Sequence, residues 1–286
     1  MPTPHLSVPS PAKLNLFLHV VGQRADGYHN IQTIFQLIDW CDILTFSPTQ
    51  TAEINLQHDI GNLPLQDNLI FRAARLLQTH TQTSLGCLIS LKKNLPIGGG
   101  LGGGSSNAAT TLLTLNHLWG TQLSISELAT LGAHLGADVP VFIHGNNAWA
   151  DGIGDRLSPI KRPRRWYLVI HPRCHIDTRA LFQHPELPRN HPKLPPQLDV
   201  PSNSTNHFAA LACQLYPQVN EALSWLNQHK SARLSGTGSC VFAEFEQLEE
   251  ANRVAQQVPT SWTCRVCAGI NTSPTHSELK KTSTTL

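Results

Sequence analysis

The chain shows an early strict alternation of apolar and polar residues between Ala12 and Val21. One face carries Leu14, Leu16, Leu18 and Val20, and the other carries Lys13, Asn15, Phe17 and His19. A period of two residues predicts a half-buried β-strand. The turn residues of Arg24–Gly27 follow, and the stretch from Ile31 to Phe46 favours a second strand.

Helical spacing appears next, at Asp67–His80, where apolar residues recur every three or four positions. Leu85–Lys92 again favours a strand. A glycine-rich loop, Asn94–Gly104, leads into a predicted helix that ends near Gly120. Ser124 and Glu127 form a capping box that opens another helix, which stops near Gly136. The first half therefore predicts alternating strands and helices.

A proline-containing basic segment, Pro159–Arg165, separates the two halves of the chain. Beyond it the pattern predicts strands at 166–171 and 262–268, helices at 208–215, 221–228 and 247–258, and a hairpin-like pair around 235–239. Residues 184–205 are rich in Pro and Asn and predict a loop. We therefore expect an N-terminal domain over 1–160, a C-terminal domain over 161–271 and a flexible tail over 272–286.

Composition narrows the class of protein. The chain has 286 residues, with 40% hydrophobic residues, 14% charged residues and a net charge of +2. This length favours two domains, and the small positive charge argues against a nucleic-acid binder. No apolar run approaches the roughly 18 residues of a membrane span, and the N-terminus lacks a secretory signal. We expect a cytoplasmic protein with no membrane or nucleic-acid partner.

Cysteine usage agrees with a reducing compartment. The 7 cysteines are odd in number and scattered. Cys264 and Cys267 have the spacing of a CxxC pair, but no second pair accompanies them. They also fall in an alternating run, so we expect buried or half-buried thiols on a strand rather than a metal or redox site.

The loop from Gly98 to Ser106 is the strongest chemical signal in the chain. Glycines let the backbone take positive φ and approach a ligand closely. The loop delivers N–H groups and a helix N-terminus to one point, and this arrangement binds anions, most often phosphate. A flexible linker is the alternative, but linkers do not usually open a helix.

The loop alone does not identify the kind of phosphate site. No Gly-Lys-Ser/Thr closes it, so it is not a Walker A loop. Gly98, Gly100 and Gly103 match the dinucleotide pattern, but a helix follows about 20 residues on, where a Rossmann unit needs a strand ending in an acidic residue. The HRD and DFG tracts of protein kinases are missing from the sequence.

Three tracts read together resemble the three motifs of the GHMP kinases. They are Pro11–Leu16, Leu95–Ala109 and Leu234–Ser239. The resemblance covers about Pro11 to Ala268 and implies an α+β fold of two domains, with ATP and an alcohol acceptor in the cleft between them. It also implies ATP as phosphoryl donor, with Mg²⁺, in a monomer or a homodimer.

Four further tracts resemble one branch of that family: Arg24–His29, Asp67–Ile70, Gly136–Phe142 and Pro185–Asn190. This resemblance implies that the acceptor is diphosphocytidyl methylerythritol. The phosphoryl group would go to its 2-hydroxyl, in the non-mevalonate route to isoprenoid precursors. The basic residues from Lys161 to Arg165 have no role in this interpretation.

The resemblance assigns catalysis to Asp138 and Lys13. Asp138 follows the helix-ending Gly136 in a loop stiffened by Pro140, and a carboxylate there can accept the hydroxyl proton. Lys13 and Asn15 lie two apart on one strand face, so a lysine can hold Asp138 ionised. The alternatives are a helix cap for Asp138 and a solvated lysine for Lys13.

On the acceptor side, the resemblance implies that Tyr28 and Phe182 stack on the two faces of the cytosine. His29 would bond its edge, and Asn15 would lie near the acceptor. A flat base needs an aromatic face and amide-like partners. The alternatives are a structural amide for Asn15 and core packing for Phe182, although Phe182 precedes a polar tract.

On the ATP side, the resemblance places Asn68 and Lys93 in the adenine pocket. It assigns the phosphates to Pro96, Gly98, Gly99, Gly100, Gly102, Gly103, Gly104, Ser105 and Ser106, with Gly236 and Thr237 in a second glycine turn. Either serine could bind phosphate or Mg²⁺ or act as a helix cap, and Thr237 could simply stabilise its turn. The sequence does not identify metal ligands.

Two other functions stay open at this point. Another small-molecule GHMP kinase, acting on mevalonate or homoserine, would have no base to stack on and no purpose for Tyr28 and His29. A non-catalytic nucleotide-binding protein on this fold would not need both Lys13 and Asp138.

Overall fold

The computed structural model describes residues 5–58, 63–201 and 204–283. The first half contains β1 (Leu6–Gln23), β2 (His29–Thr49), β3 (Ile54–His58), the 3₁₀ helix η1 (Leu65–Asp67), α1 (Leu69–Thr81), β4 (Gly86–Lys92), α2 (Gly103–Leu118), α3 (Ile125–Ala133), α4 (Val139–His144), β5 (Ala148–Asp151) and β6 (Arg156–Pro159). The second half contains β7 (Trp166–His171), α5 (Thr178–Gln183), α6 (Ala209–Leu215), α7 (Pro217–Asn227), β8 (Ala232–Leu234), β9 (Val241–Phe245), α8 (Leu248–Ala255), β10 (Thr263–Ile270) and α9 (Pro274–Ser283).

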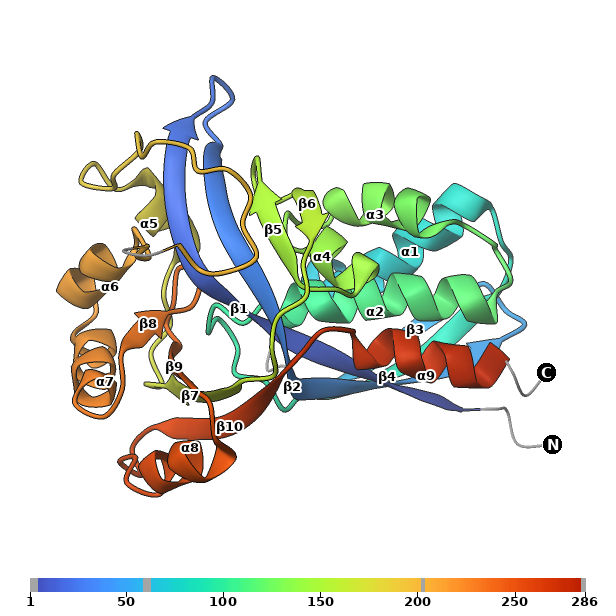
Figure 1. Ribbon diagram of the computed structural model, residues 1–286. Helices are drawn as coiled ribbons and strands as arrows, with labels where there is room; N and C mark the ends of the chain where they lie inside the picture. The colour runs from blue at the N-terminus through green and yellow to red at the C-terminus, as the bar shows by residue number, and fades with distance from the viewer. Residues whose placement is uncertain (1–4, 59–62, 202–203, 284–286) are drawn as a thin grey trace.

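One mixed sheet joins both halves of the chain. Its strand order is β3-β4-β2-β10-β7-β9-β8, and β1, β5 and β6 attach through β2. At 21 residues, β2 is long enough to pair with β1, β4, β5 and β10 at different points. In Figure 1 the tip of the β1–β2 hairpin rises between α5 on one side and β5 on the other. The predicted α+β class is confirmed.

The first strand is buried on both faces, which differs from the half-buried strand that the alternation predicts. Lys13 is 3% exposed and Asn15 2% exposed. The main-chain N–H of Lys13 bonds the carbonyl of Leu101 at 3.0 Å, and that of Asn15 bonds the Ser235 hydroxyl at 3.4 Å. The polar face is thus covered by segments far away in the chain, which local periodicity does not reveal.

The helices of the first half cover one side of the sheet, and their predicted starts are confirmed. Asn68 caps α1 by accepting a hydrogen bond from the N–H of Ile70 at 2.9 Å. Ser124 and Glu127 form the expected capping box of α3. Helix α2 begins directly after the glycine loop, with Gly102 in the left-handed region as its N-cap. The core between these helices and the sheet therefore fixes the position of the loop.

The second half follows its predicted pattern with some shifts. Strands β7 and β10 and helices α6 and α8 lie where expected, while α7 begins earlier, because Pro217 fits the first turn of a helix. Of the CxxC pair on β10, Cys264 is half-buried and Cys267 buried, as expected. Burial raises the pKa of both thiols, which disfavours the thiolate needed for a metal.

The tail predicted to be flexible from residue 272 is largely a helix. Pro274–Ser283 form α9, which lies beside β1 and α2 in Figure 1. The Thr275 hydroxyl donates to the carbonyl of Pro9 at 2.6 Å, and a His276 ring nitrogen lies 2.8 Å from the carbonyl of Ile143. These polar contacts hold α9 in place, although the helix has few apolar residues to pack. Residues 284–286 of the predicted tail lie outside the described part.

The division near residue 160 stays a proposal. Chain on both sides of it shares one sheet, and β2 pairs with β10 through Ile38 and Gly269. Leu18, Val20 and Ile31, at the hairpin tip, belong to a core cluster otherwise built from the second half. We use "first lobe" for the α1–α4 side and "second lobe" for the β7–β10 side.

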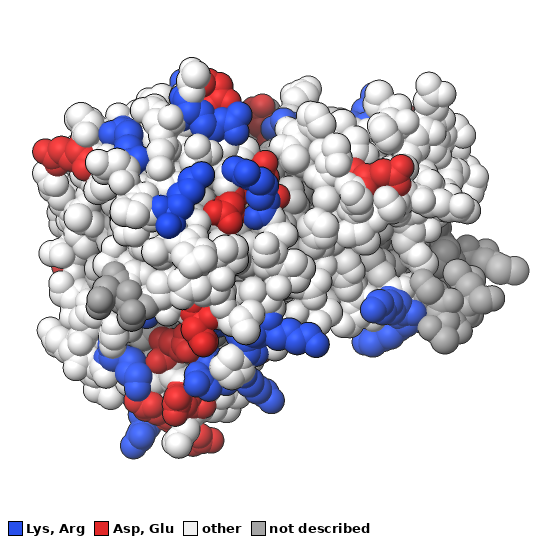
Figure 2. Space-filling model, turned by 45° about the horizontal axis from the view of Figure 1, so that its top comes forward, with Lys and Arg blue, Asp and Glu red and all other residues white. Residues whose placement is uncertain are grey.

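Two basic residues of the Pro159–Arg165 segment, Arg162 and Arg165, form ion pairs. Arg162 lies 3.5 Å from Glu244, and Arg165 lies 3.4 Å from Glu244 and 3.2 Å from Glu246. On the face shown in Figure 2, acidic and basic side chains gather side by side at the lower left. Within the described ranges, no helix combines the length and the apolar character that crossing a bilayer requires.

Three imidazoles connect the β1–β2 hairpin to the segment before α6. The ring centroid of His19 lies 3.9 Å from that of His191 and 4.9 Å from that of His207. His207 Nδ1 accepts the N–H of Val20 at 3.1 Å, and His19 Nε2 accepts that of Thr205 at 3.4 Å. A neutral imidazole that accepts on one nitrogen carries its proton on the other. Neither ring therefore has a second lone pair for a metal.

We expect this cluster to make stability depend on pH. Burial, and then the neighbouring His191 and His207, lower the pKa of His19 to about 4. Between its ordinary value of 6.5 and about 4, the unfolded chain binds a proton that the folded chain does not. The free energy of unfolding should therefore fall as pH drops through that window.

Thermal melts at closely spaced pH values between 7.5 and 4 check this prediction. His19→Gln should flatten the dependence, because its side chain does not titrate. His80→Gln is the control, since His80 is exposed on α1, and it should keep the wild-type slope. An equal slope in wild type and His19→Gln would contradict the prediction.

Candidate active site

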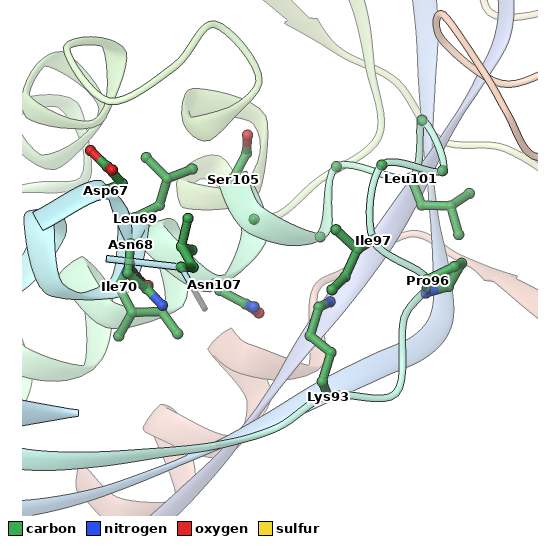
Figure 3. A pocket seen from close by; sticks show the side chains of 17 residues that line it. Asp67, Asn68, Leu69, Ile70, Lys93, Pro96, Ile97, Leu101, Ser105 and Asn107 are labelled. Atoms are coloured by element: carbon green, nitrogen blue, oxygen red, sulfur yellow. Dashed lines mark hydrogen bonds between the residues drawn. The ribbon is translucent and has the colours of Figure 1, made fainter. Parts of the chain in front are cut away.

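The glycine loop lines a cavity of about 370 Å³ in the first lobe. One wall comes from the start of α1, and another from the segment Lys93–Gly104. Figure 3 shows Asn68 and Asn107 on one side of the cavity and Lys93 and Ile97 on the other. Apolar walls with a few polar groups are typical of small-molecule sites. The lining includes these predicted ATP residues: Asn68, Lys93, Pro96, Gly98, Gly99, Gly100, Gly102, Gly103, Gly104 and Ser105.

The start of α2 supplies the anion-binding groups of this cavity. The first helical bond is from the N–H of Ser106 to the carbonyl of Gly102, at 2.8 Å. The N–H groups of Gly103, Gly104 and Ser105 precede it and have no acceptor within the helix. Together with the positive end of the helix dipole, they are suited to phosphate oxygens.

Ser106 differs from its predicted role. It is fully buried, and its hydroxyl lies 2.7 Å from that of Ser10 on β1. Its N–H is taken by Gly102, so neither group is directed to the cavity. Neither serine caps α2, because the N-cap is Gly102. Ser105 lines the cavity, and Ser106 holds α2 against β1.

Asp42 on β2 organises the entry to the loop and was missed in the sequence. Its carboxylate is buried and accepts from Lys93 Nζ at 2.6 Å, from Asn107 Nδ2 at 3.0 Å, and from the N–H groups of Asn94 and Leu95 at 2.8 Å each. A buried charge is tolerated when it is paired and hydrogen-bonded in this way. An acidic residue inside an apolar β-leaning stretch was the available signal.

Two polar atoms in the cavity lining region have no partner among the described residues. They are Asn68 Nδ2, a donor, and Asn107 Oδ1, an acceptor. Both residues are 2% exposed. Buried polar groups are normally satisfied, so these two atoms stand out, although both are closed off from the open space of the cavity. Asn107 is a second residue that the sequence analysis did not single out.

Gly100 is the point where the loop meets the second lobe. It has φ +73°, and a Cβ there would lie 2.1 Å from the Ser235 carbonyl oxygen and 2.9 Å from that of Gly238. The Ser235 hydroxyl also donates to the Gly100 carbonyl at 3.0 Å. Any side chain at this position must push the two glycine turns apart.

We therefore expect Gly100→Ala to weaken ATP binding by about tenfold or more, the equivalent of one lost charge-assisted hydrogen bond. Gly120→Ala is the matched control. Gly120 has a similar φ of +63°, but a Cβ there would meet no described atom within 4 Å, so the substitution introduces backbone strain without a clash. Calorimetric titration with ATP checks the pair, and equal affinities in the two variants would contradict the prediction.

Lys13 and Asp138 come together beside the loop. Lys13 Nζ lies 3.2 Å from Asp138 Oδ2, and donates to Asn15 Oδ1 at 2.6 Å and to the Gly100 carbonyl at 3.1 Å. These three acceptors match the three N–H groups of an ammonium. The Lys13 side chain is 4% exposed and that of Asp138 is 32% exposed. The carboxylate is thus oriented by the lysine and open to a ligand.

The structure separates the two interpretations of Asp138. Asp138 is the N-cap residue of α4, but its side chain makes no capping hydrogen bond. Its main chain is in the right-handed helical region, at φ −83° and ψ −10°, whereas a capping residue is usually extended. The carboxylate is paired with Lys13 instead. The buried Lys13 likewise is no solvated lysine.

Asn15 and the second glycine turn complete this centre. Asn15 Nδ2 donates to the Thr33 hydroxyl at 3.0 Å, so its amide is held in place. A Cβ on Gly236 would lie 3.3 Å from Asn15 Oδ1, so the turn packs on Asn15 and Gly100. The Thr237 hydroxyl lies 2.8 Å from that of Thr178 and stabilises the turn. Gly236 and Thr237 are outside the cavity lining.

The predicted base-binding residues are brought together in part. The rings of His29 and Phe182 have centroids 5.4 Å apart, and Phe182 packs edge-on against Phe208 at 4.7 Å. Tyr28 directly precedes His29 at the hairpin tip. Its side chain is 62% exposed, so its stacking on a base stays a prediction. Arg189 contacts His29. In the sequence, Arg189 stood out only as part of the Pro185–Asn190 tract.

Two family models match the chain. The one described as GHMP kinases N terminal domain matches residues 68–146, and the one described as GHMP kinases C terminal matches residues 201–264. The chain is 47% identical over 287 aligned positions to a protein of Hahella chejuensis named 4-diphosphocytidyl-2-C-methyl-D-erythritol kinase, covering 96% of this chain and 97% of that protein.

Solved structures agree. A crystal structure of 4-(cytidine 5'-diphospho)-2C-methyl-D-erythritol kinase matches with a TM-score of 0.80 and 30% identity, covering 93% of this chain and 100% of that one. The Methanococcus jannaschii mevalonate kinase matches with a TM-score of 0.68 and 16% identity, covering 95% and 100%. At that identity, the second match shows the fold alone.

Proposed function

The chain belongs to the GHMP kinase family, and on that premise we propose that it is an ATP-dependent kinase for 4-diphosphocytidyl-2-C-methyl-D-erythritol. The γ-phosphoryl group passes from ATP to the 2-hydroxyl of the acceptor. The observation that carries the catalytic part is the 3.2 Å pair of Lys13 Nζ and Asp138 Oδ2 beside Gly100. The 47% identity to the Hahella protein supports the choice of acceptor.

Asp138 accepts the proton of the attacking hydroxyl. Phosphoryl transfer relies on positioning and on charge stabilisation, and a carboxylate serves as the base. Lys13 keeps Asp138 ionised and directs one of its oxygens. Its ammonium also offsets negative charge as the alkoxide forms. Lys13 donates a hydrogen bond to the carbonyl of Gly100, in the loop that holds the phosphates. This bond aligns ATP with the hydroxyl that attacks it.

ATP lies in the glycine-loop cavity in this proposal. The free N–H groups of Gly103, Gly104 and Ser105 contact the phosphates, and the adenine lies on the side of the cavity that Asn68 and Asn107 line. The cavity is lined by first-lobe residues alone, so only the reacting centre lies at the junction of the lobes. This refines the expected cleft between domains.

Mg²⁺ fits the donors present, because it takes oxygen ligands and keeps several waters. Ser105 lies at the start of α2 and lines the cavity. We assign its hydroxyl as a ligand of Mg²⁺. When bound, the ion would neutralise charge on the phosphate oxygens.

The chain's 7 free cysteines suit a reducing compartment, and we propose a cytoplasmic location.

The acceptor's base lies at the other end of the site, beside His29 and Phe182, with Tyr28 closing on its open face. A mevalonate- or homoserine-type kinase would have no use for this aromatic pocket. A non-catalytic nucleotide binder would not need the ordered Lys13–Asp138 pair. Both alternatives predict a different response to added acceptor.

Steady-state assays with ATP and Mg²⁺ over a panel of acceptors test the proposal. ADP formation should depend on the diphosphocytidyl acceptor and be negligible with mevalonate or homoserine. Turnover with mevalonate or homoserine at comparable kcat/KM would reject the substrate. Tight ATP binding without turnover on any acceptor would favour the non-catalytic alternative.

A further inference from the structure

Arg189, in the loop after α5, uses all of its hydrogen-bond donors. Its two terminal nitrogens donate to four main-chain carbonyls, of Phe182 at 3.2 Å, His184 at 2.8 Å, Pro185 at 3.4 Å and Leu187 at 3.0 Å. Its Nε donates to His29 Nε2 at 3.0 Å. A guanidinium has five N–H groups in a rigid plane, and each has an acceptor here. The side chain is fixed in one orientation.

This contact decides which nitrogen of His29 carries a proton. A guanidinium has no acceptor and does not lose its proton in proteins. His29 Nε2 must therefore offer its lone pair, and a neutral ring then carries its hydrogen on Nδ1. Burial, and then the charge of Arg189, lower the pKa of His29, so the doubly protonated ring is disfavoured. His29 is left with one donor, at Nδ1.

The same arginine also fixes the aromatic neighbour. By binding the carbonyl of Phe182, it holds the end of α5, and the Phe182 ring lies 5.4 Å from the His29 ring. His29 itself is 6% exposed, so its ring has little freedom to turn. One residue thus sets both an aromatic face and a hydrogen-bond donor at the place where a base is expected.

We propose that Arg189 is a positioning residue that selects cytosine over uracil by holding His29 as an Nδ1–H donor. The inference rests on the proposed function, because it takes a pyrimidine base to lie beside His29. The inference takes N3 of the base to face His29 Nδ1, and N3 is an acceptor in cytosine and an N–H donor in uracil. An Nδ1–H group held in place donates a hydrogen bond to N3 of cytosine. With uracil, the same group meets the N3–H, so that two donors face each other without an acceptor.

Calorimetric binding of CDP and UDP tests the selection, with saturating ADP present to occupy the glycine-loop cavity. Wild type should bind CDP about 5- to 150-fold more tightly than UDP, the cost of one unpaired buried donor. In Arg189→Met that ratio should fall towards one, with ADP affinity unchanged. Arg164→Met is the control, because Arg164 lies over the Trp166 ring at 5.0 Å and makes no contact with His29 in the described structure.

Nitrogen-15 NMR of the wild-type His29 ring is a second readout that does not depend on the variant folding. The inference predicts a protonated Nδ1 and an unprotonated Nε2. An Nε2–H tautomer, equal affinity of wild type for CDP and UDP, binding of neither, or an unchanged ratio in folded Arg189→Met would each overturn it. If the wild-type protein prefers CDP over UDP but shows no kinase activity with the diphosphocytidyl acceptor, the proposed function is rejected instead.

Discussion

Asp138→Asn is expected to lower kcat by about 10²–10⁴-fold, the usual contribution of a general base. The amide keeps the size of the carboxylate and still accepts a hydrogen bond from Lys13, but it does not take up a proton at neutral pH. The fold should be retained, because the Asp138 side chain makes no capping bond to α4. Steady-state kinetics beside a thermal melt measures both effects.

Asp177→Asn is the matched control for this variant. Asp177 is also the N-cap of a helix, but its side chain does cap, accepting from the N–H groups of Arg179 and Ala180. Asn caps about as well as Asp, so this variant should keep wild-type turnover. A folded Asp138→Asn protein with activity within a few-fold of wild type would remove Asp138 from catalysis.

Lys13→Met should cost about 10²–10³-fold in kcat, as for other preorganised electrostatic groups. Met keeps most of the length of the stem and removes the charge. The carboxylate of Asp138 then loses its ion partner, and Asn15 Oδ1 and the Gly100 carbonyl lose a donor. Asn15 Oδ1 is the buried acceptor left without a donor, since the Gly100 carbonyl keeps the Ser235 hydroxyl and Asp138 is 32% exposed. We therefore also expect a loss of stability of about 1–3 kcal/mol.

Lys92→Met separates the charge from the position. Lys92 is exposed at the end of β4, so its replacement should change neither kcat nor the melting temperature appreciably. Lys13→Met should differ from it in both. If the two variants show equal turnover, Lys13 has no part in the reaction, whatever its effect on the melt.

Local sequence patterns predicted the elements that local forces determine. The capping box at Ser124, the helix after the glycine loop and the alternation of β1 all depend on neighbours within a few residues, and each was confirmed as an element. The glycine-loop residues lie around one cavity, and ATP binding there stays a prediction. Glycine permits the backbone geometry of such a loop, which is why it shows in the sequence, whereas the contacts of the loop with Lys13 and Ser235 do not.

What the sequence did not reveal depends on contacts across the chain. The polar face of β1 is buried because Leu101 and Ser235 lie against it. Helix α9 is ordered by bonds from Thr275 and His276 to the first lobe. The Ser106 hydroxyl lies 2.7 Å from that of Ser10 on β1 and does not line the cavity. Periodicity measures apolar content within one segment, so it misses elements held by polar contacts with distant segments.

The two organising residues were missed for the same reason. Asp42 gathers four donors from the segment after β4 and from α2, and Arg189 gathers five acceptors from α5, its own loop and His29. In the sequence, Asp42 shows only as an acidic residue in an apolar stretch, and Arg189 only as part of a motif. Only the fold shows that Asp42 is buried and that every donor of Arg189 is used.

The fate of the γ-phosphoryl group is the most direct test of the central claim. Wild-type protein is incubated with Mg²⁺, γ-labelled ATP and 4-diphosphocytidyl-2-C-methyl-D-erythritol, and the product is examined by phosphorus and carbon NMR. The label should appear as a phosphomonoester on the 2-oxygen of the acceptor, with one ADP formed for each product. Label released as inorganic phosphate, or attached to another hydroxyl, would contradict the account.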